Sequence, residues 1–149
     1  MQTLFFSGNT SFTGTSLLVE NTNKLSLLNS ASVKVDSLSA SNLSVSQNAR
    51  VSVSSASDLS VDNLNIILDD ISPVSFADIF SASDGTSIVF SAETTNISVM
   101  NSSGEVYNDV DFAYDGDGNI IGISEVPEPS ALSAIIGSLA LIFALRRRR

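Results

Sequence analysis

The chain has 149 residues and contains no His, Cys or Trp. This excludes Ser-His-Asp and Cys-His catalysis, disulfides, and zinc sites built from Cys and His. Sixteen acidic residues stand against seven basic ones, and four of the basic residues end the chain, so residues 1–145 carry a net charge of −13. Such acidity disfavours nucleic acid and anionic polysaccharide as partners, while the hydrophobic content of 43% supports a folded core.

The N-terminal residues do not read as a secretory signal peptide. Residues 1–10 lack both a basic start and an apolar run. Three explanations stay open: a C-terminal piece of a longer protein, a misassigned start, or targeting by the C-terminal segment. The following stretch, residues 7–19 (SGNTSFTGTSLLV), resembles the autotransporter-associated β-strand repeat of bacterial surface proteins in its residue types.

Internal repeats predict a β-solenoid over residues 1–68. Residues 39–45 (SASNLSV) recur as residues 55–61 (SASDLSV) after sixteen positions, and residues 31–35 recur as residues 49–53 after eighteen. Apolar residues alternate with polar ones, which is the period of a strand with one buried face. The fold class expected is all-β, a right-handed parallel β-helix with strands of three to five residues and with Lys34 and Arg50 pointing outward. An antiparallel sandwich is the alternative.

Residues 69–125 are expected to form a β-rich cap on the solenoid, because the repeat fades there. One helical turn is predicted over residues 75–80 with Ser75 as its N-cap. Strands are predicted near residues 87–92, 96–100, 105–114 and 119–124. The last two flank residues 115–118 (DGDG), a strong hairpin signal. A cap is needed because the last rung of a stack otherwise exposes its core and an unpaired edge.

The hairpin turn also offers a candidate calcium loop. Asp115, Asp117 and Asn119 place side-chain oxygens at alternate positions, as the start of an EF-hand loop does. The sixth position is Ile120 instead of Gly, and the twelfth is Val126 instead of Glu. A plain hairpin turn is therefore the preferred interpretation, and a calcium-dependent binding module is the alternative. No other metal site and no cofactor are expected.

The last residues have a three-part organisation. Residues 126–130 (VPEPS) hold two prolines that keep the chain extended. Residues 130–145 carry no charge and would span about 24 Å as a helix, somewhat less than the roughly 30 Å core of a bilayer. Four arginines follow and would mark the cytoplasmic side. The expectation is a single C-terminal transmembrane helix after an exposed strip.

This order of elements resembles the PEP-CTERM sorting signal, with the resemblance confined to residues 126–149. In bacteria with that system, a membrane-embedded exosortase recognises the tail. The resemblance implies transient residence in the inner membrane and then a place on the cell surface or in the extracellular matrix. It assigns the sorting motif to Val126, Pro127, Glu128, Pro129 and Ser130, and the basic cluster to Arg146, Arg147, Arg148 and Arg149.

The function expected is a structural or adhesive protein of an extracellular polysaccharide matrix, without enzymatic activity. Its expected partners are an exosortase, the membrane and exopolysaccharide. Two alternatives to this function are the calcium-dependent binding module and the C-terminal fragment of a polysaccharide-active enzyme whose active residues precede Met1. Glycosidase chemistry needs paired carboxylates in one groove, and the adjacent Asp69 and Asp70 would point to opposite faces of a strand.

Overall fold

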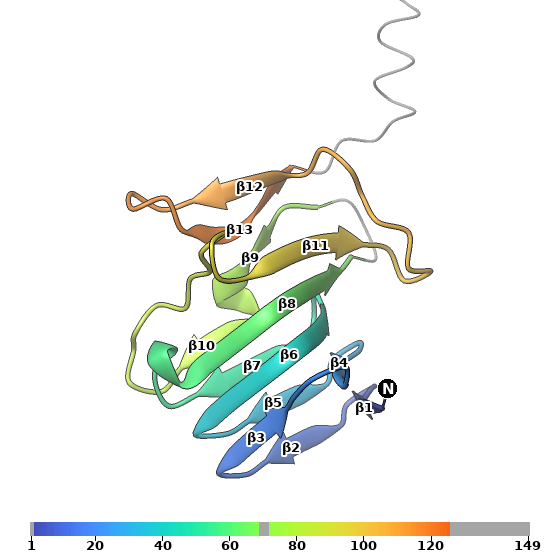
Figure 1. Ribbon diagram of the computed structural model, residues 1–149, viewed down its shortest axis with the longest axis vertical. Helices are drawn as coiled ribbons and strands as arrows, with labels where there is room; N and C mark the ends of the chain where they lie inside the picture. The colour runs from blue at the N-terminus through green and yellow to red at the C-terminus, as the bar shows by residue number, and fades with distance from the viewer. Residues whose placement is uncertain (1, 69–71, 126–149) are drawn as a thin grey trace, which may run out of the picture.

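Two stacks of parallel strands form the body of the molecule, and the chain passes from one to the other (Figure 1). The computed structural model describes residues 2–68 and 72–125. Sheet A contains β1 (Thr3–Phe6), β4 (Lys24–Leu27), β6 (Ser37–Ser46), β8 (Leu59–Ile67) and β11 (Asn96–Met100) in that order, and β3 (Ser16–Val19) also pairs with β6. Sheet B contains β2 (Ser11–Thr13), β5 (Ser32–Lys34), β7 (Arg50–Val53) and β10 (Phe80–Ala82).

This alternation makes a β-solenoid of about three turns. Every pairing within sheets A and B is parallel, from β1 with β4 to β11 with β8. The predicted all-β solenoid is confirmed, and the alternative of an antiparallel sandwich is wrong for this body.

The register of the coils differs from one of the two predicted repeats. Val33 pairs with Val51, eighteen residues later, as predicted. Ser39, however, pairs with Ser60 and Leu43 pairs with Leu64, both after 21 residues and not sixteen. The sixteen-residue repeat is wrong because residues 56–58 form a corner, the 3-10 turn η1 (Ala56–Asp58).

Apolar side chains of equivalent positions lie on top of one another and fill the space between the sheets. One column, from sheet A, contains Leu25, Leu43 and Leu64, all 0% exposed. A facing column from sheet B contains Val33, Val51 and Phe80. Because each inward side chain sits on its equivalent in the next coil, a short alternating pattern is enough to build a continuous core.

Asparagines stack along one corner of sheet A and join the coils. The Asn63 side chain donates hydrogen bonds to the Ser41 carbonyl at 3.1 Å and to Asn42 Oδ1 at 3.3 Å. It accepts one from Asn96 Nδ2 at 3.2 Å. Asn42 in turn donates to the backbone carbonyls of the turn below. The hydrogen bonds of this ladder stabilise the corner, where side chains no longer alternate regularly between inward and outward positions.

A non-repetitive segment closes the end of the solenoid beyond β8 (Figure 1). It includes β9 (Val74–Ser75), the 3-10 turn η2 (Phe76–Asp78), and the hairpin of β12 (Asp111–Tyr114) and β13 (Ile120–Glu125). β13 pairs antiparallel with both β12 and β9. The predicted hairpin and the strand over residues 96–100 are confirmed. Residues 87–92 contribute only the bridge of Phe90 with Ile120, and the strand predicted over 105–114 is reduced to its last four residues.

Three aromatic rings seal the core at this closed end. Phe76, Phe80 and Phe90 are buried and contact one another edge to face, with ring centroids 5.2–6.3 Å apart. Phe76 comes from η2, the single helical turn that the sequence predicted. Ser75 is the N-cap residue of that turn, as predicted, but its side chain makes no capping hydrogen bond.

The part of the predicted fold class that included a transmembrane helix is wrong. Across residues 2–68 and 72–125 no helix is long and apolar enough to cross a membrane, and the helical parts are the 3-10 turns η1 and η2. The physical reason is that the apolar residues there alternate with Ser, Asn and Asp, so they form strands and not a continuous apolar helix. Residues 130–145, where the helix was expected, lie outside the described residues.

Candidate functional site

The sequence-predicted site residues fall into two groups. The sorting motif, residues 126–130, and the basic cluster, residues 146–149, lie outside the described residues. The candidate calcium loop lies in the turn that joins β12 to β13.

In that turn, Asp115 is used as a local hydrogen-bond acceptor. Its Oδ1 accepts the backbone N–H groups of Asp117 and Asn119, both at 2.9 Å, and its Oδ2 accepts the Asn119 side chain at 3.1 Å. The Asn119 hydrogen bonds in particular lower the pKa of the Asp115 carboxyl below its ordinary value of 3.8. Within the described residues, no three Asp or Glu side chains gather as metal ligands would. The geometry is that of an Asx-stabilised hairpin turn.

A different surface stands out once the strands are stacked: the outer face of sheet B. Its outward side chains alternate with the half-buried Phe12 and the buried Val33 and Val51. They comprise five hydroxyl groups and two cations, which are Ser11, Thr13, Ser32, Lys34, Arg50, Ser52 and Ser81. None of the four strands contains Asp or Glu. We call these seven residues the hydroxyl-cation face.

The cations of this face lie on neighbouring strands. Lys34 pairs with Ser52 and Arg50 pairs with Ser32, so the two cations lie diagonally, about 8 Å apart along the backbone by strand geometry. Arg50 donates to the Ala49 carbonyl at 2.9 Å, which holds its side chain along the face. In the described part of the chain, neither cation forms an ion pair. The face therefore concentrates two of the three positive charges that residues 1–145 hold.

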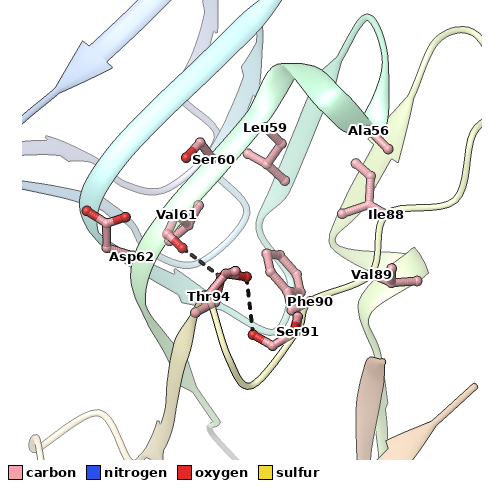
Figure 2. Close-up of a pocket in the computed structure, with 11 residues that line it drawn as sticks. Ala56, Leu59, Ser60, Val61, Asp62, Ile88, Val89, Phe90, Ser91 and Thr94 are labelled. Atoms are coloured by element: carbon pink, nitrogen blue, oxygen red, sulfur yellow. Dashed lines mark hydrogen bonds between the residues drawn. The ribbon is translucent and has the colours of Figure 1, made fainter. Parts of the chain in front are cut away.

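A hollow of about 220 Å³ lies beside the first half of β8, and Figure 2 shows the residues that line it. Leu59 to Asp62 form one wall, and residues 88–91 with Thr94 and Thr95 form the other. Thr95 donates its hydroxyl hydrogen to the Val61 carbonyl at 2.8 Å. This bond gives the Val61 carbonyl a partner at a point of β8 that lies before its pairing with β11 begins. Asp62 is the one carboxylate of this lining, so the hollow lacks the pair that glycoside hydrolysis uses.

The loop that precedes residues 88–91 is held by a small hydrogen-bond network. Asp84 Oδ1 accepts the Thr86 hydroxyl at 2.6 Å and the Thr86 N–H at 2.9 Å. Thr86 Oγ1 accepts the N–H of Ala56 at 2.8 Å. The Thr86 bonds lower the pKa of the exposed Asp84 carboxyl below 3.8. We assign this network to loop structure.

Sequence reasoning expected Lys34 and Arg50 to point outward, and both are exposed. It did not find that the two cations share one face with five hydroxyl groups. The eighteen-residue repeat contained that information, because it aligns residues 32–34 with residues 50–52. Ser11, Thr13 and Ser81 carried no repeat signal that sequence reasoning recognised.

Comparison with protein-family models, with curated proteins and with solved structures finds no match to this chain. The case for a function therefore depends on the residues and geometry described above.

Proposed function

We propose that the chain is a non-catalytic structural or adhesive protein of a bacterial extracellular matrix, and that the hydroxyl-cation face contacts acidic polysaccharide. The observation that carries the proposal is the composition of this face, which has five hydroxyl groups, no carboxylate on its strands, and two cations without an ion pair among residues 2–68 and 72–125. The acidic chain as a whole repels an anionic polymer, and this repulsion is smallest where the cations of the face lie.

Each part of the face suits a polysaccharide. Stacked strands repeat at about 4.8 Å, so the hydroxyl groups form rows that an extended polymer can follow. Hydroxyl groups both donate and accept hydrogen bonds with sugar hydroxyls. Lys34 and Arg50 supply the charge that uronate carboxylates require, and the guanidinium binds carboxylates in a defined geometry. The rigid solenoid holds these groups in place, so binding orders few side chains.

Sorting to the cell surface is the second part of the proposal. It is supported by residues 126–149, where the Pro-Glu-Pro motif and the terminal arginines follow the order of a PEP-CTERM signal. An exosortase-type enzyme would be the partner that reads this signal and releases the protein to the matrix.

The polysaccharide contact is tested by affinity electrophoresis in gels containing polygalacturonate. The double variant Lys34→Ser with Arg50→Ser should reduce the retardation several-fold, because it removes both positive charges of the face. Serine is chosen as the replacement because a serine already occupies the paired position on the neighbouring strand in each case. Lys24→Ser is the matched control, since it removes one cation from sheet A. All variants carry Arg146→Ser to Arg149→Ser, which removes the other basic cluster from the comparison. Equal losses from Lys24→Ser and from the paired change would refute the assigned face.

The sorting part is tested separately by replacing Pro127, Glu128 and Pro129 with alanine in a bacterium that has an exosortase. The processed, exported form should be lost. If it appears at normal levels, residues 126–130 do not direct sorting, while the polysaccharide result stands or falls on its own.

A further inference from the structure

The first half of β8 has one edge that no strand covers in the described part of the chain. β6 pairs with the other edge, whereas β11 begins to pair with β8 only at Asn63. Where β11 would continue, residues 91–95 form a turn, in which the Thr95 N–H bonds to the Ser91 carbonyl at 2.9 Å. The hollow of about 220 Å³ therefore lies where the next strand over residues 59–61 would stand.

The direction of the backbone groups on this edge follows from the pairing of β6. The Ser37 N–H of β6 bonds toward β3, to the Thr15 carbonyl at 3.2 Å. Parallel pairing uses alternate residues, so the backbone groups of Leu38 face β8. Leu38 lies opposite Leu59, and the backbone groups of Leu59 and Val61 therefore face away from β6, toward the hollow.

Two of these four groups already have partners. The Leu59 N–H bonds to the Ala56 carbonyl, and the Val61 carbonyl accepts the Thr95 hydroxyl at 2.8 Å. The Leu59 C=O and the Val61 N–H have no hydrogen-bond partner among residues 2–68 and 72–125. In a parallel sheet, a C=O and the N–H two positions later bond to one residue of the neighbouring strand. The edge can therefore hold one residue of a parallel strand, opposite Ser60.

This pair of groups suits a peptide. A residue in an extended chain directs its own N–H and C=O to the same side, so it can satisfy both groups at once. The N–H and C=O of a single trans amide point in opposite directions, so the acetamido group of an amino sugar can satisfy only one of them. The hollow is also smaller than the roughly 300–1,000 Å³ of typical small-molecule sites, which fits a short stretch of chain.

The charge around the hollow selects the side chain of such a peptide. Val61 is buried, while Ser60 and Asp62 are exposed on the outer side of β8. A residue opposite Ser60 directs its side chain to that same outer side, about 8 Å from Asp62 by strand geometry, within reach of a lysine or an arginine. Asp62 is the one charged residue of the lining, and the turn beside it includes the exposed Glu93. Both charges favour a cation.

A second edge, on β10, provides a contrast. β10 pairs with β7 on one side, and on its other side no strand lies among the described residues. A hollow of about 390 Å³ adjoins Phe80, Ser81 and Ala82 of this strand, but no charged side chain lines it. Nothing there selects an occupant, so the edge of β10 serves as an internal reference.

We propose that the first half of β8 binds an extended, basic peptide segment of another protein by adding it as a parallel strand. A lysine or arginine of that segment lies opposite Ser60, donates its backbone N–H to the Leu59 C=O and accepts the Val61 N–H. Its cationic side chain lies beside Asp62. The contact is short, because Thr95 already occupies the edge at the Val61 carbonyl. This site is separate from the hydroxyl-cation face, which lies on sheet B.

The test is an NMR titration of the ¹⁵N-labelled full chain, in mild non-ionic detergent, with the peptide acetyl-Ala-Val-Lys-Val-Ala-amide. The amide signal of Val61 should move most and should saturate at millimolar peptide. Methylation of the lysine backbone nitrogen removes the bond to the Leu59 C=O and should weaken binding by about fivefold or more. Glutamate in place of the lysine should weaken it at least as much, through repulsion by Asp62.

A variant of the chain checks the charge. Asp62→Asn should weaken binding of the lysine peptide several-fold. Asp117→Asn is the matched control, because it removes an equal charge from the exposed hairpin turn and should leave the affinity unchanged. An Asp62→Asn chain that binds the lysine peptide as tightly as the control overturns the assigned cation.

Three further outcomes overturn the proposal. The first is a Val61 signal that stays in place at millimolar lysine peptide, and the second is equal binding of the N-methylated peptide. The third is a set of shifts centred on Phe80 and Ala82, which would move the site to β10. The titration is repeated with Arg146 to Arg149 replaced by serine. Binding that appears only then would mean that the chain's own arginines, and not another protein, take this edge.

Discussion

The two ends of the solenoid are built by different means. The coils that contain β1 to β8 succeed one another after 18 or 21 residues and need only alternation and stacking. At the closed end the spacing grows to 29 residues between β7 and β10 and to 33 between β8 and β11. The additional residues supply the aromatic seal, and the hairpin of β12 and β13 follows β11. Repetition extends a stack, but closing it requires sequence that does not repeat.

Removing the aromatic seal should have the largest effect on stability. Phe76→Ala deletes a fully buried ring that contacts Phe80 and Phe90, and we expect the free energy of unfolding to fall by about 3–5 kcal/mol. Phe12→Ala, in β2 of the first coil, removes a half-buried ring and should cost clearly less. Urea unfolding followed by circular dichroism measures both. Equal costs at the two ends would contradict the asymmetry described here.

The next largest effect is expected at the contact between β13 and β9. A Cβ atom at Gly122 would clash with the Val74 carbonyl oxygen, which is backbone and cannot move aside. Gly122→Ala should therefore destabilise the fold by about 1–3 kcal/mol and loosen the hairpin.

Gly116→Ala is the matched control for this substitution. A Cβ atom there meets nothing within 4 Å and Gly116 has no positive φ, so its melting temperature should stay close to that of the unaltered chain. If both alanine variants melt alike, close packing of β13 on β9 is not what selects glycine at position 122.

A smaller effect is expected in the asparagine ladder. Asn63→Ala removes two donated hydrogen bonds and one accepted bond at a half-buried corner, and should cost about 1 kcal/mol or slightly more. Asn96→Ala, at the end of the ladder, removes one bond between exposed side chains and should cost less. Thermal melts of the two variants show which substitution destabilises the fold more. A larger loss for Asn96→Ala than for Asn63→Ala would mean that the hydrogen bonds of Asn63 are not the main stabilising contacts of the ladder.

The smallest effect concerns acid stability. The pKa values of Asp84 and Asp115 are lowered by hydrogen bonds to their charged forms, so these bonds stabilise the fold above about pH 4 and are lost as the pH falls through the lowered values. The melting temperature of the unaltered chain should decline below pH 4. With Asp84→Asn and Asp115→Asn together, that decline should be shallower, because neither position titrates.

The solenoid was predictable from sequence because its core uses short alternating patterns, and the eighteen-residue repeat gave one register correctly. The sixteen-residue repeat failed because strand length was underestimated: β6 has ten residues and β8 has nine. Each holds two pairs of inward residues, as in Leu38 with Ala40 and Leu43 with Val45, and the corner at Asn42 interrupts the alternation. The 21-residue spacing of Asn42 and Asn63 was the signal that identifies the correct register.

The closed end and the hydroxyl-cation face were harder to predict. The aromatic seal is formed by residues 76, 80 and 90, and Phe90 pairs with Ile120 through a single β-bridge. These residues have no regular spacing in the sequence, so no periodic pattern predicts their contact. The face exists only because four separate strands are stacked in register. Its members are ordinary surface residues in the sequence, and their proximity follows from the sheet.

The constant 21-residue step between equivalent positions of β6 and β8 also has a consequence for how such a molecule can vary. Duplicating or deleting exactly one such unit would shift everything beyond it by one inter-strand distance, about 4.8 Å, and leave each side chain above an equivalent neighbour. The length of the solenoid can thus change in steps of one coil by unequal recombination, while the sequences at its two ends stay the same.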